Sequence, residues 1–427
     1  MMKEEKVFKD PVHKYIYVQD KTIWDLINTR EFQRLRRIRQ LGTSYLTFHG
    51  AEHSRFSHSL GVYEITRKII SQFERNHYEG WPQEERLLCL CAALLHDLGH
   101  GPFSHSIESA FGTKHEDWSC KIVLGDTEVN RVLSEVSPDF PKKVAGVICK
   151  SYHEEIVVSL VSSQLDADRM DYLLRDAYFT GVNYGTFDLE RILRVIRPYK
   201  GHIVVKESGM HAVEDYLMSR YQMYWQVYFH PVTRSAEILL HKIFARAKHL
   251  YEDNYRFSFM VDPILHLIQN KLSLEDYLLL DESVMQTMLT FWCSESDPIL
   301  VDLCRRFLDR KLYKYSTFEE SSNKRVIQRM EQAMREAGFD PIYYMEIDFP
   351  SDLSYDVYRP GESDEKLPIL LLDHREHLTE ITHKSEIVRS ISGIHMGAHH
   401  IYYPEELQER LNATVYADLW ALLGEQL

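Results

Sequence analysis

Apolar positions along the chain follow two different periods, and each period predicts a different kind of element. Residues 7–18 alternate polar and apolar side chains around Pro11, which predicts a short β-hairpin or an extended arm. From Thr22 onward the apolar residues recur every three or four positions, as they do on one face of a helix. We therefore expect a helical chain that begins with a short β arm.

The helical pattern continues through most of the first 340 residues. One run of apolar residues recurs at intervals of three, and Gly42 is expected to end its helix; the run is Phe32, Leu35, Ile38 and Leu41. The spacing further predicts helices over residues 58–76, 82–98, 115–124, 187–195, 213–229 and 234–251, with others between 127 and 177. The apolar run within residues 202–207 predicts a strand, and residues 260–340 are expected to be helical.

After about Pro341 the pattern changes. Apolar runs over residues 342–349, 367–373 and 399–404 predict strands, and residues 404–422 predict a last helix. The expected fold class is mainly α, with a helical core, a short N-terminal β arm and a small C-terminal α+β part. We place the core in residues 1–240, a helical extension in 241–340 and the C-terminal subdomain in 341–427.

Composition narrows the class of protein. With 427 residues, 44% of them hydrophobic, the chain can bury a large core. Its net charge of −14 argues against a protein that coats nucleic acid. The first ten residues lack the apolar region of a secretory signal, and the apolar run at 87–95 is too short to span a bilayer. The six cysteines form no CxxC pair, so we expect a cytoplasmic protein without disulfides and without a membrane partner.

Candidate chemistry is concentrated in "LLHDLGHGPFSH", residues 94–105. An apolar helix ends there in His96 and Asp97, and the following glycine-containing turns present His100 and His105. Buried polar groups cost free energy unless they are paired or bind a metal. Imidazole and carboxylate are ligands that suit Mn, Fe, Zn, Ni or Co, and Mg is a further candidate. The sequence therefore predicts a metal centre at the end of this helix.

Two other segments supply the remaining ligand types. His58 lies upstream in "RFSHSLGV", and Asp166, Asp168, Asp171 and Asp176 lie downstream in "QLDADRMDYLLRD". A single histidine among 22 is more often structural than a ligand, but the joint pattern offers four ligands from three helices. The spacing is compatible with one or with two metal ions.

These stretches resemble the HD superfamily of metal-dependent phosphohydrolases. More narrowly, the sequence is similar to the deoxynucleoside triphosphate triphosphohydrolases, the branch that contains the animal SAM-and-HD-domain enzymes and their bacterial relatives. The similarity runs in the family's order from Lys6 to Asp176 and, more weakly, to about His230; no SAM domain is present. The matching stretches are "KVFKDPVH", "EFQRLRRIRQLG", "HSRFSHSLGV", "HDLGHGPFSH" and "LDADRMDYLLRD".

The resemblance assigns roles to named positions. The divalent-metal ligands are expected to be His58, His96, Asp97 and Asp168. The residues expected to act on the phosphates are His100, His115, Glu108 and His105, with Glu108 orienting a catalytic histidine. The substrate-binding residues are expected to be Gln40, Arg55, Tyr172, Asp176, Arg220 and Tyr228, with Gln40 and Asp176 reaching the 3′-hydroxyl.

A regulatory site is also implied by the resemblance. In animal relatives the matching region binds an activating nucleotide at a subunit interface, so we expect a possible allosteric site and a homodimer or homotetramer. The matching positions are Lys6, Val7, Gln33 and Arg36. Asn28 and Lys9 depart from the pattern that reads guanine, so no guanine specificity is implied. The arginines at positions 30–39 fit this interpretation and a plain solvated helix face equally well.

The leading hypothesis is hydrolysis of a dNTP to deoxynucleoside and inorganic triphosphate. One alternative is an HD phosphodiesterase or phosphatase that acts on another nucleotide. Another is a catalytically silent nucleotide sensor, whose hallmark would be a broken ligand set. The intact ligands and the sugar-facing residues Gln40, Tyr172 and Asp176 favour the first.

Overall fold

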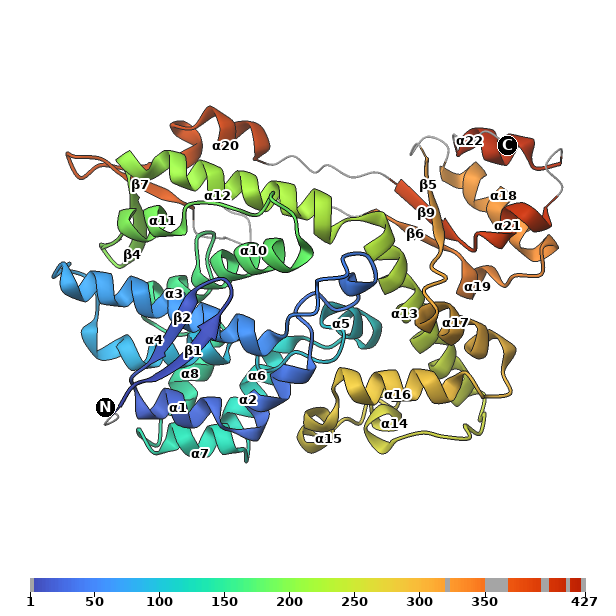
Figure 1. The fold of residues 1–427 in the computed structure, drawn as a ribbon, viewed down its shortest axis with the longest axis horizontal. Coiled ribbons are helices and arrows are strands. Elements are labelled where there is room, and N and C mark those ends of the chain that lie inside the picture. Colours follow the sequence, from blue (N-terminus) through green and yellow to red (C-terminus); the bar gives the residue numbers. More distant parts are fainter. Residues whose placement is uncertain (1–3, 319–322, 350–367, 393–398, 412–414, 424–427) are drawn as a thin grey trace.

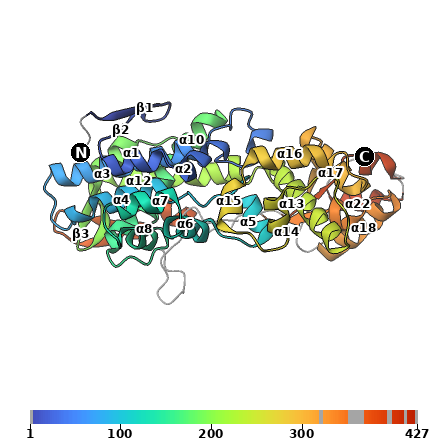
Figure 2. The ribbon, with the colours of Figure 1, turned by 90° about the horizontal axis from the view of Figure 1, so that it is seen from below.

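Helices dominate the computed structural model, which describes residues 4–318, 323–349, 368–392, 399–411 and 415–423. The strands of the described residues form three small sheets of two, four and three strands. The molecule is elongated and has two lobes, with the N-terminus in one and the C-terminus in the other (Figures 1 and 2). The prediction of a mainly α fold with a β arm and a C-terminal α+β part is confirmed.

The N-terminal hairpin is present as predicted. Strand β1 (Lys6–Asp10) pairs antiparallel with β2 (Lys14–Val18), and Lys6 lies opposite Val18. Two short helices follow, α1 (Lys21–Ile27) and α2 (Arg30–Arg34), and α2 continues as the 3-10 turn η1 (Leu35–Arg37).

The prediction that this helix runs to Gly42 is wrong. The backbone becomes extended at Ile38, whose carbonyl accepts a hydrogen bond of 2.9 Å from the Arg55 amide. Arg39 and Ser54 form an isolated antiparallel bridge beside it. Pairing with a distant segment therefore overrides the local helical pattern, and Gly42 lies in a turn with φ of +51°.

The first lobe packs around a helix that is buried from Leu88 to Leu95, α4 (Arg86–Leu95). It packs against α3 (Arg55–Arg75), and α10 (Ala167–Thr180) packs against α3 in turn. The Asp166 side chain caps α10 by accepting from the Arg169 amide, and Gly181 ends the helix in the left-handed region. The remaining helices are α6 (His115–Leu124), α7 (Glu128–Ser134), α8 (Phe140–Ile148), α9 (Glu155–Val161), α11 (Leu189–Val195) and α12 (Met210–Met223).

The long helix α13 (Pro231–Glu252) leads from the first lobe into the second (Figure 1). A second hydrophobic cluster forms around it, and this cluster also takes in Phe103, Ile107 and Trp118 from the first part of the chain. The short helix α5 (His105–Phe111) therefore packs on this second core, against α13. The other helices of this lobe are α14 (Asp262–Ile268), α15 (Leu274–Leu279), α16 (Glu282–Trp292), α17 (Pro298–Leu308) and α18 (Asn323–Glu336).

The C-terminal part of the chain contributes to both lobes. Strand β7 (Leu370–Leu372) pairs parallel with β4 (His202–Lys206) in the sheet order β3-β4-β7-β8, with β3 (Ile196–Tyr199) and β8 (Leu378–Glu380) outside them. Helix α20 (Glu386–Ile391) lies beside α12 (Figure 1). Strand β9 (His399–Tyr403) instead lies in the second lobe, between β5 (Lys314–Phe318) and β6 (Glu346–Asp348). The three-part division of the chain stays a prediction.

Four other element predictions need correction. Strand β5 interrupts the segment 260–340, which was expected to be helical throughout. Residues expected to begin a strand form α19 (Pro341–Tyr344), because the Asp340 side chain caps a helical turn before β6. The predicted last helix is divided into two helices, α21 (Glu406–Arg410) and α22 (Ala417–Leu422), because the backbone is extended at Leu411. Helix α12 ends at Met223 and passes into a π-helical turn, η5 (Tyr224–Tyr228).

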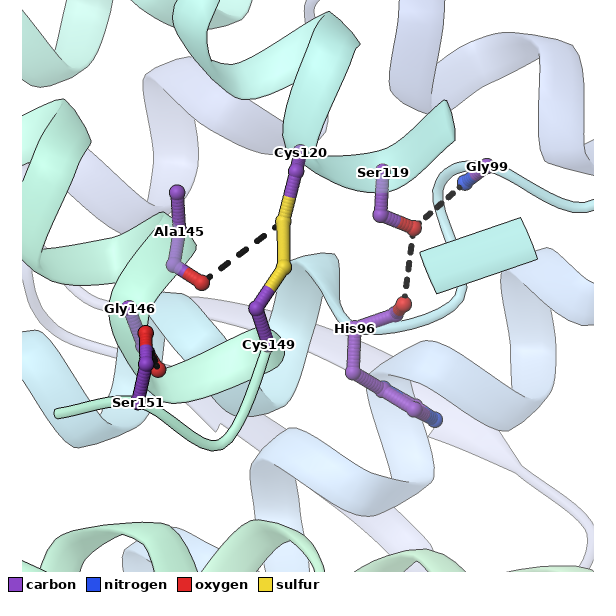
Figure 3. Close-up of a disulfide and its surroundings, with 8 residues drawn as sticks. All are labelled: His96, Gly99, Ser119, Cys120, Ala145, Gly146, Cys149 and Ser151. Carbon is purple, nitrogen blue, oxygen red and sulfur yellow. Dashed lines mark hydrogen bonds between the residues drawn. A yellow bond between two sulfur atoms is a disulfide. The ribbon is translucent and has the colours of Figure 1, made fainter. Parts of the chain in front are cut away.

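The expectation of no disulfide is wrong. Cys120 in α6 and Cys149 just after α8 are bonded to each other (Figure 3). The two residues are 29 positions apart in the sequence, so the spacing of the cysteines carried no signal for the pairing. Cys89, Cys91, Cys293 and Cys304 are free. Among the described helices, none has both the length and the apolar character needed to cross a membrane.

We predict that breaking this disulfide destabilises the first lobe. Closing a loop of this size lowers the entropy of the unfolded chain by an amount worth roughly 3–4 kcal/mol. Cys149→Ser should therefore lower the thermal midpoint by several degrees relative to Cys293→Ser, which removes a free thiol. Thiol titration of the denatured, unreduced protein should count four groups, and a count of six would contradict the pairing.

Candidate active site

The four expected metal ligands converge between three helices. His58 comes from α3, His96 and Asp97 follow the end of α4, and Asp168 lies in the first turn of α10. The His58 Nε2 atom is 3.1 Å from Asp168 Oδ1 and 3.6 Å from Asp97 Oδ2. The His96 Nε2 atom is 3.3 Å from Asp97 Oδ1 and 3.5 Å from Asp168 Oδ1. Two imidazoles and two carboxylates thus face one point.

Each histidine ring is held from behind so that Nε2 faces this point. His58 Nδ1 is 2.8 Å from Asp171 Oδ2, and His96 Nδ1 is 2.9 Å from the Ala93 carbonyl oxygen. Both Nε2 atoms are buried and have no hydrogen-bond partner. Buried polar atoms are rarely left in this state, and a ligating histidine has its other nitrogen fixed in this way. The residues present therefore fit a divalent cation with nitrogen and oxygen ligands.

The carboxylates also control the protonation of these histidines. Burial lowers the pKa of His58, but the adjacent carboxylates of Asp168 and Asp171 outweigh it and raise that pKa to about 10. Burial likewise opposes a charged His96, yet Asp97 and Asp168 raise its pKa as well. In the metal-free protein the histidines hold protons among the carboxylates, and a bound cation would replace those protons.

Asp171 was counted among the acidic residues of its segment, but it was not given a role. It accepts from His13 Nε2 at 2.6 Å and from Arg175 Nε at 2.8 Å, in addition to its contact with His58. Helix α3 approaches this carboxylate closely because it has no side chain at Gly61, where a Cβ atom would lie 1.8 Å from Asp171 Oδ1. This network could not be predicted from local sequence patterns, because His13 lies 158 positions from Asp171.

A second cluster groups the four residues expected to act on the phosphates, around the Glu108 carboxylate. Glu108 Oε1 is 3.2 Å from His100 Nδ1 and 3.0 Å from His115 Nδ1, and Glu108 Oε2 is 3.3 Å from His105 Nδ1. The rings of His100 and His115 stack with their centroids 3.8 Å apart. His100 also lies 3.3 Å from Asp97 Oδ1, which joins the two clusters.

The two stacked histidines have opposite proton affinities. Burial and the Arg55 guanidinium lower the pKa of His100 to about 3. Burial also acts against a charged His115, but its hydrogen bond to Glu108 and the nearby Asp97 raise its pKa. One ring is therefore suited to remain neutral and the other to carry a proton, which is the arrangement that acid–base chemistry needs.

The loop that carries His100 is fixed by neighbouring backbone and side-chain contacts. The Ser119 hydroxyl accepts from the Gly99 amide at 2.8 Å and donates to the His96 carbonyl at 2.9 Å (Figure 3). A Cβ atom at Gly99 would lie 2.1 Å from the His115 carbonyl oxygen, so only glycine allows this approach. The buried Arg34 donates to the His100 carbonyl at 2.8 Å. Arg34 is therefore neither solvated nor available to a phosphate.

The two clusters open into a cavity of about 490 Å³. Five of the expected substrate residues line it, namely Gln40, Arg55, Tyr172, Asp176 and Tyr228. The π-helical turn η5 brings Tyr224 and Tyr228 to its wall, and the Tyr228 hydroxyl donates to Asp176 Oδ2 at 2.8 Å.

Arg220, the sixth expected substrate residue, does not line the cavity. It is buried behind the wall, 5.6 Å from the Tyr224 ring, and it donates to Gln164 Oε1 at 3.3 Å. A direct role for Arg220 in binding stays a prediction.

Residues expected at a regulatory site lie apart from this cavity. The Gln33 amide donates to the Ile27 carbonyl at 2.7 Å, and Arg36 donates to Gln33 Oε1 at 2.8 Å. Lys6 and Val7 are exposed on β1, where the Lys6 ammonium lies 5.9 Å from the Trp24 ring. A regulatory nucleotide, the oligomeric state and the cytoplasmic location all stay predictions.

Comparison with known proteins identifies the same segments. The HD domain family matches residues 55–176, and the HD associated region matches residues 187–262. The uncharacterized protein YwfO of Bacillus subtilis is 59% identical over 406 residues, which cover 95% of this chain and 94% of YwfO. A deoxynucleoside triphosphate triphosphohydrolase SAMHD1 homolog of Dictyostelium discoideum is 29% identical over 69% of this chain and 63% of its own. The crystal structure of a phosphohydrolase from Bacteroides thetaiotaomicron has a TM-score of 0.82 and 26% identity, covering 94% of this chain and all of that one.

We predict that Asp171→Asn weakens metal binding by about 10- to 100-fold, because it loosens the ring of His58. Arg175 keeps Asp10 as a partner, at 2.8 Å, so the fold should survive. Titration of the purified apoprotein against a competing chelator measures the affinity, and circular dichroism checks the fold. Asp126→Asn, at a side chain that is 96% exposed, is the matched control. Equal affinities of the two variants would show that Asp171 does not support the metal ligands.

Proposed function

The chain belongs to the HD-domain family of phosphohydrolases, and on this premise we propose that it hydrolyses dNTPs to deoxynucleoside and inorganic triphosphate. The observation that carries the proposal is the order of side chains along α10. Asp168, Tyr172 and Asp176 are each four residues apart, so they lie on one face at steps of about 6 Å. That face joins the metal-ligand cluster at one end to the Tyr228-bonded carboxylate at the other.

A nucleotide can use this whole face. Its phosphates belong beside Asp168, where Arg55 and the histidines supply positive charge and hydrogen-bond donors. Its sugar belongs beside Tyr172, Asp176 and Gln40, whose side chains line the same cavity. A site for any phosphate ester would not need the second group of residues. The Dictyostelium relative, named as a deoxynucleoside triphosphate triphosphohydrolase, supports this reading of the substrate.

The proposed reaction is attack of water at the α-phosphorus, with departure of the deoxynucleoside 5′-oxygen. A divalent cation held by His58, His96, Asp97 and Asp168 would supply Lewis acidity and lower the pKa of a coordinated water. Arg55 lines the cavity, where its positive charge can offset that of a phosphate. Its guanidinium is held in place by bonds to Asp97, to Ser104 Oγ at 3.0 Å and to the Gln40 carbonyl at 3.2 Å.

The chain's own histidines would manage the protons. The Glu108 carboxylate contacts Nδ1 of His115. The raised pKa of His115 favours a protonated ring, which can give a proton to the leaving 5′-oxygen. His100 has a lowered pKa and remains a neutral acceptor next to Asp97. His105 is the exposed member of the cluster, with a side chain that is 73% exposed, and it is free to turn toward the outer phosphates.

Product analysis tests the reaction class. Purified protein is incubated with each of the four dNTPs, singly and mixed, in Mn²⁺ or Mg²⁺, and the products are separated by chromatography. We expect deoxynucleoside and intact triphosphate in equal amounts. Activity that appears only in mixtures would support an activating nucleotide. Diphosphate or monophosphate products would favour another HD phosphohydrolase activity, and no product in any mixture would favour a sensor.

We predict that His96→Ala and Asp97→Ala each lower turnover by at least about a thousandfold. Loss of one ligand empties or distorts the cation site, which is expected to supply the largest part of the rate enhancement. Turnover is measured with saturating metal, and metal content is measured on the same samples. His49→Ala, at an exposed position outside the cavity, should retain activity. Near-full turnover in either ligand variant after metal exchange would exclude this mechanism.

A further inference from the structure

We infer that His53 is a positioning residue that sets the 3′-hydroxyl end of the nucleotide site; the inference rests on the function proposed above. His53 is not in the cavity lining, and no role was assigned to it from the sequence. Its Nε2 atom lies 2.7 Å from Asp176 Oδ1, and both side chains are buried, with exposed fractions of 0% and 2%. His53 therefore acts on the site through Asp176 and not by touching the substrate.

The tautomer of His53 follows from its surroundings. Its Nδ1 atom is buried and has no hydrogen-bond partner. A proton on Nδ1 would therefore be left without an acceptor, at the cost of an unmade buried hydrogen bond. The geometry therefore places a proton on Nε2, which donates to Asp176. Because Tyr228 donates to the other oxygen of the same carboxylate, both oxygens of Asp176 are fixed in direction.

His53 also fixes the second residue of this end of the site. Its backbone carbonyl accepts a hydrogen bond of 2.9 Å from the backbone N–H of Gln40, beside the bridge between Arg39 and Ser54. Gln40 lines the cavity, and its side-chain Oε1 is buried without a hydrogen-bond partner. An acceptor in this state calls for a donor from a ligand. One residue thus holds Gln40 by its backbone and Asp176 by its side chain.

The position of His53 is itself well determined. Its ring stacks on Phe179, with centroids 4.6 Å apart and planes 14° apart. The preceding loop lies against the same residue, because a Cβ atom at Gly50 would be 2.3 Å from the Phe179 carbonyl oxygen. Phe179 belongs to the last turn of α10, so the loop, the helix and the sugar-facing carboxylate are placed together. A histidine that served only to fill the core would not need its donor aimed at Asp176.

The consequence is a specific dependence on the 3′-hydroxyl. A hydroxyl donated to a fixed, buried carboxylate discriminates strongly against a substrate that lacks it, whereas a carboxylate that can rotate does not. We expect the ratio of kcat/KM for a dNTP to that for its 2′,3′-dideoxy analogue to be large in the wild-type protein. His53→Ala should lower this ratio by about 10- to 100-fold.

The experiment measures that ratio in the full-length, metal-loaded protein. In His53→Ala the dNTP rate should fall toward the dideoxy rate, while kcat for the dideoxy substrate changes little. His53→Gln, whose amide nitrogen can reach Asp176, should restore much of the ratio, and His53→Asn, which is one carbon shorter, should not. If His53→Ala fails to fold, the Gln and Asn variants carry the same comparison. His49→Ala is the control in the same loop.

Two different failures can be told apart. A wild-type ratio in His53→Ala and His53→Asn, or an equal fall in both rates, would overturn the positioning role and leave the proposed function standing. Absence of hydrolysis of every nucleotide by the wild-type protein would overturn the proposed function, and this inference with it. Parallel loss of the ratio in Asp176→Ala and His53→Ala would support the path from His53 through Asp176.

Discussion

The rest of the site depends on the contacts that the buried carboxylate of Asp171 makes with three other side chains. It accepts from His58, His13 and Arg175, and so joins α3, the N-terminal hairpin and α10 at one point. Removing one partner from such a buried charged network costs about 3–5 kcal/mol, so the network has few alternative arrangements. Asp168 lies one turn before Asp171 on the same helix, and the position of the metal ligands therefore follows from the packing of α3 on α10.

Helix α10 connects this network to the cavity. One side of it carries Asp171 and Arg175, which contact His13 and Asp10 of the hairpin. The other side presents Asp168, Tyr172 and Asp176 to the cavity. Asp168 and Asp176 make this face acidic, in a chain whose net charge is −14. Negative charge of this kind would by itself repel a polyanionic nucleotide. Arg55 and a histidine cluster line the same cavity and offset this charge locally, and a divalent cation held by the four expected ligands would add further positive charge there. Under the proposed function, binding of a phosphate ester would therefore depend on the metal, as catalysis would.

The sequence revealed the parts of the site whose chemistry is local. A His-Asp pair at the end of an apolar helix has few structural explanations, and His58, His96, Asp97 and Asp168 do converge. The same reasoning could not find His13 or His53, because their roles come from partners 158 and 123 positions away. It misplaced the end of the helix at Gly42, where pairing of Ile38 with Arg55 decides the backbone, and it missed the Cys120–Cys149 bond for the same reason. Tertiary contacts, and not local propensity, decide each of these features.

The second lobe is part of this site and not an appendage to it. The Tyr277 ring stacks on Trp118 with centroids 3.9 Å apart, and its hydroxyl donates to the Gly99 carbonyl in the loop that carries His100. Arg34 connects the same loop to the Leu280 carbonyl, with donor–acceptor distances of 2.7 and 3.0 Å. Residues 55–176 alone would thus contain the four expected metal ligands but lack His13, the cavity-lining Gln40 and the support beneath His100. The HD segment contains the candidate metal ligands, and the chain on both sides of it supplies contacts that hold these ligands and the neighbouring cavity residues in place.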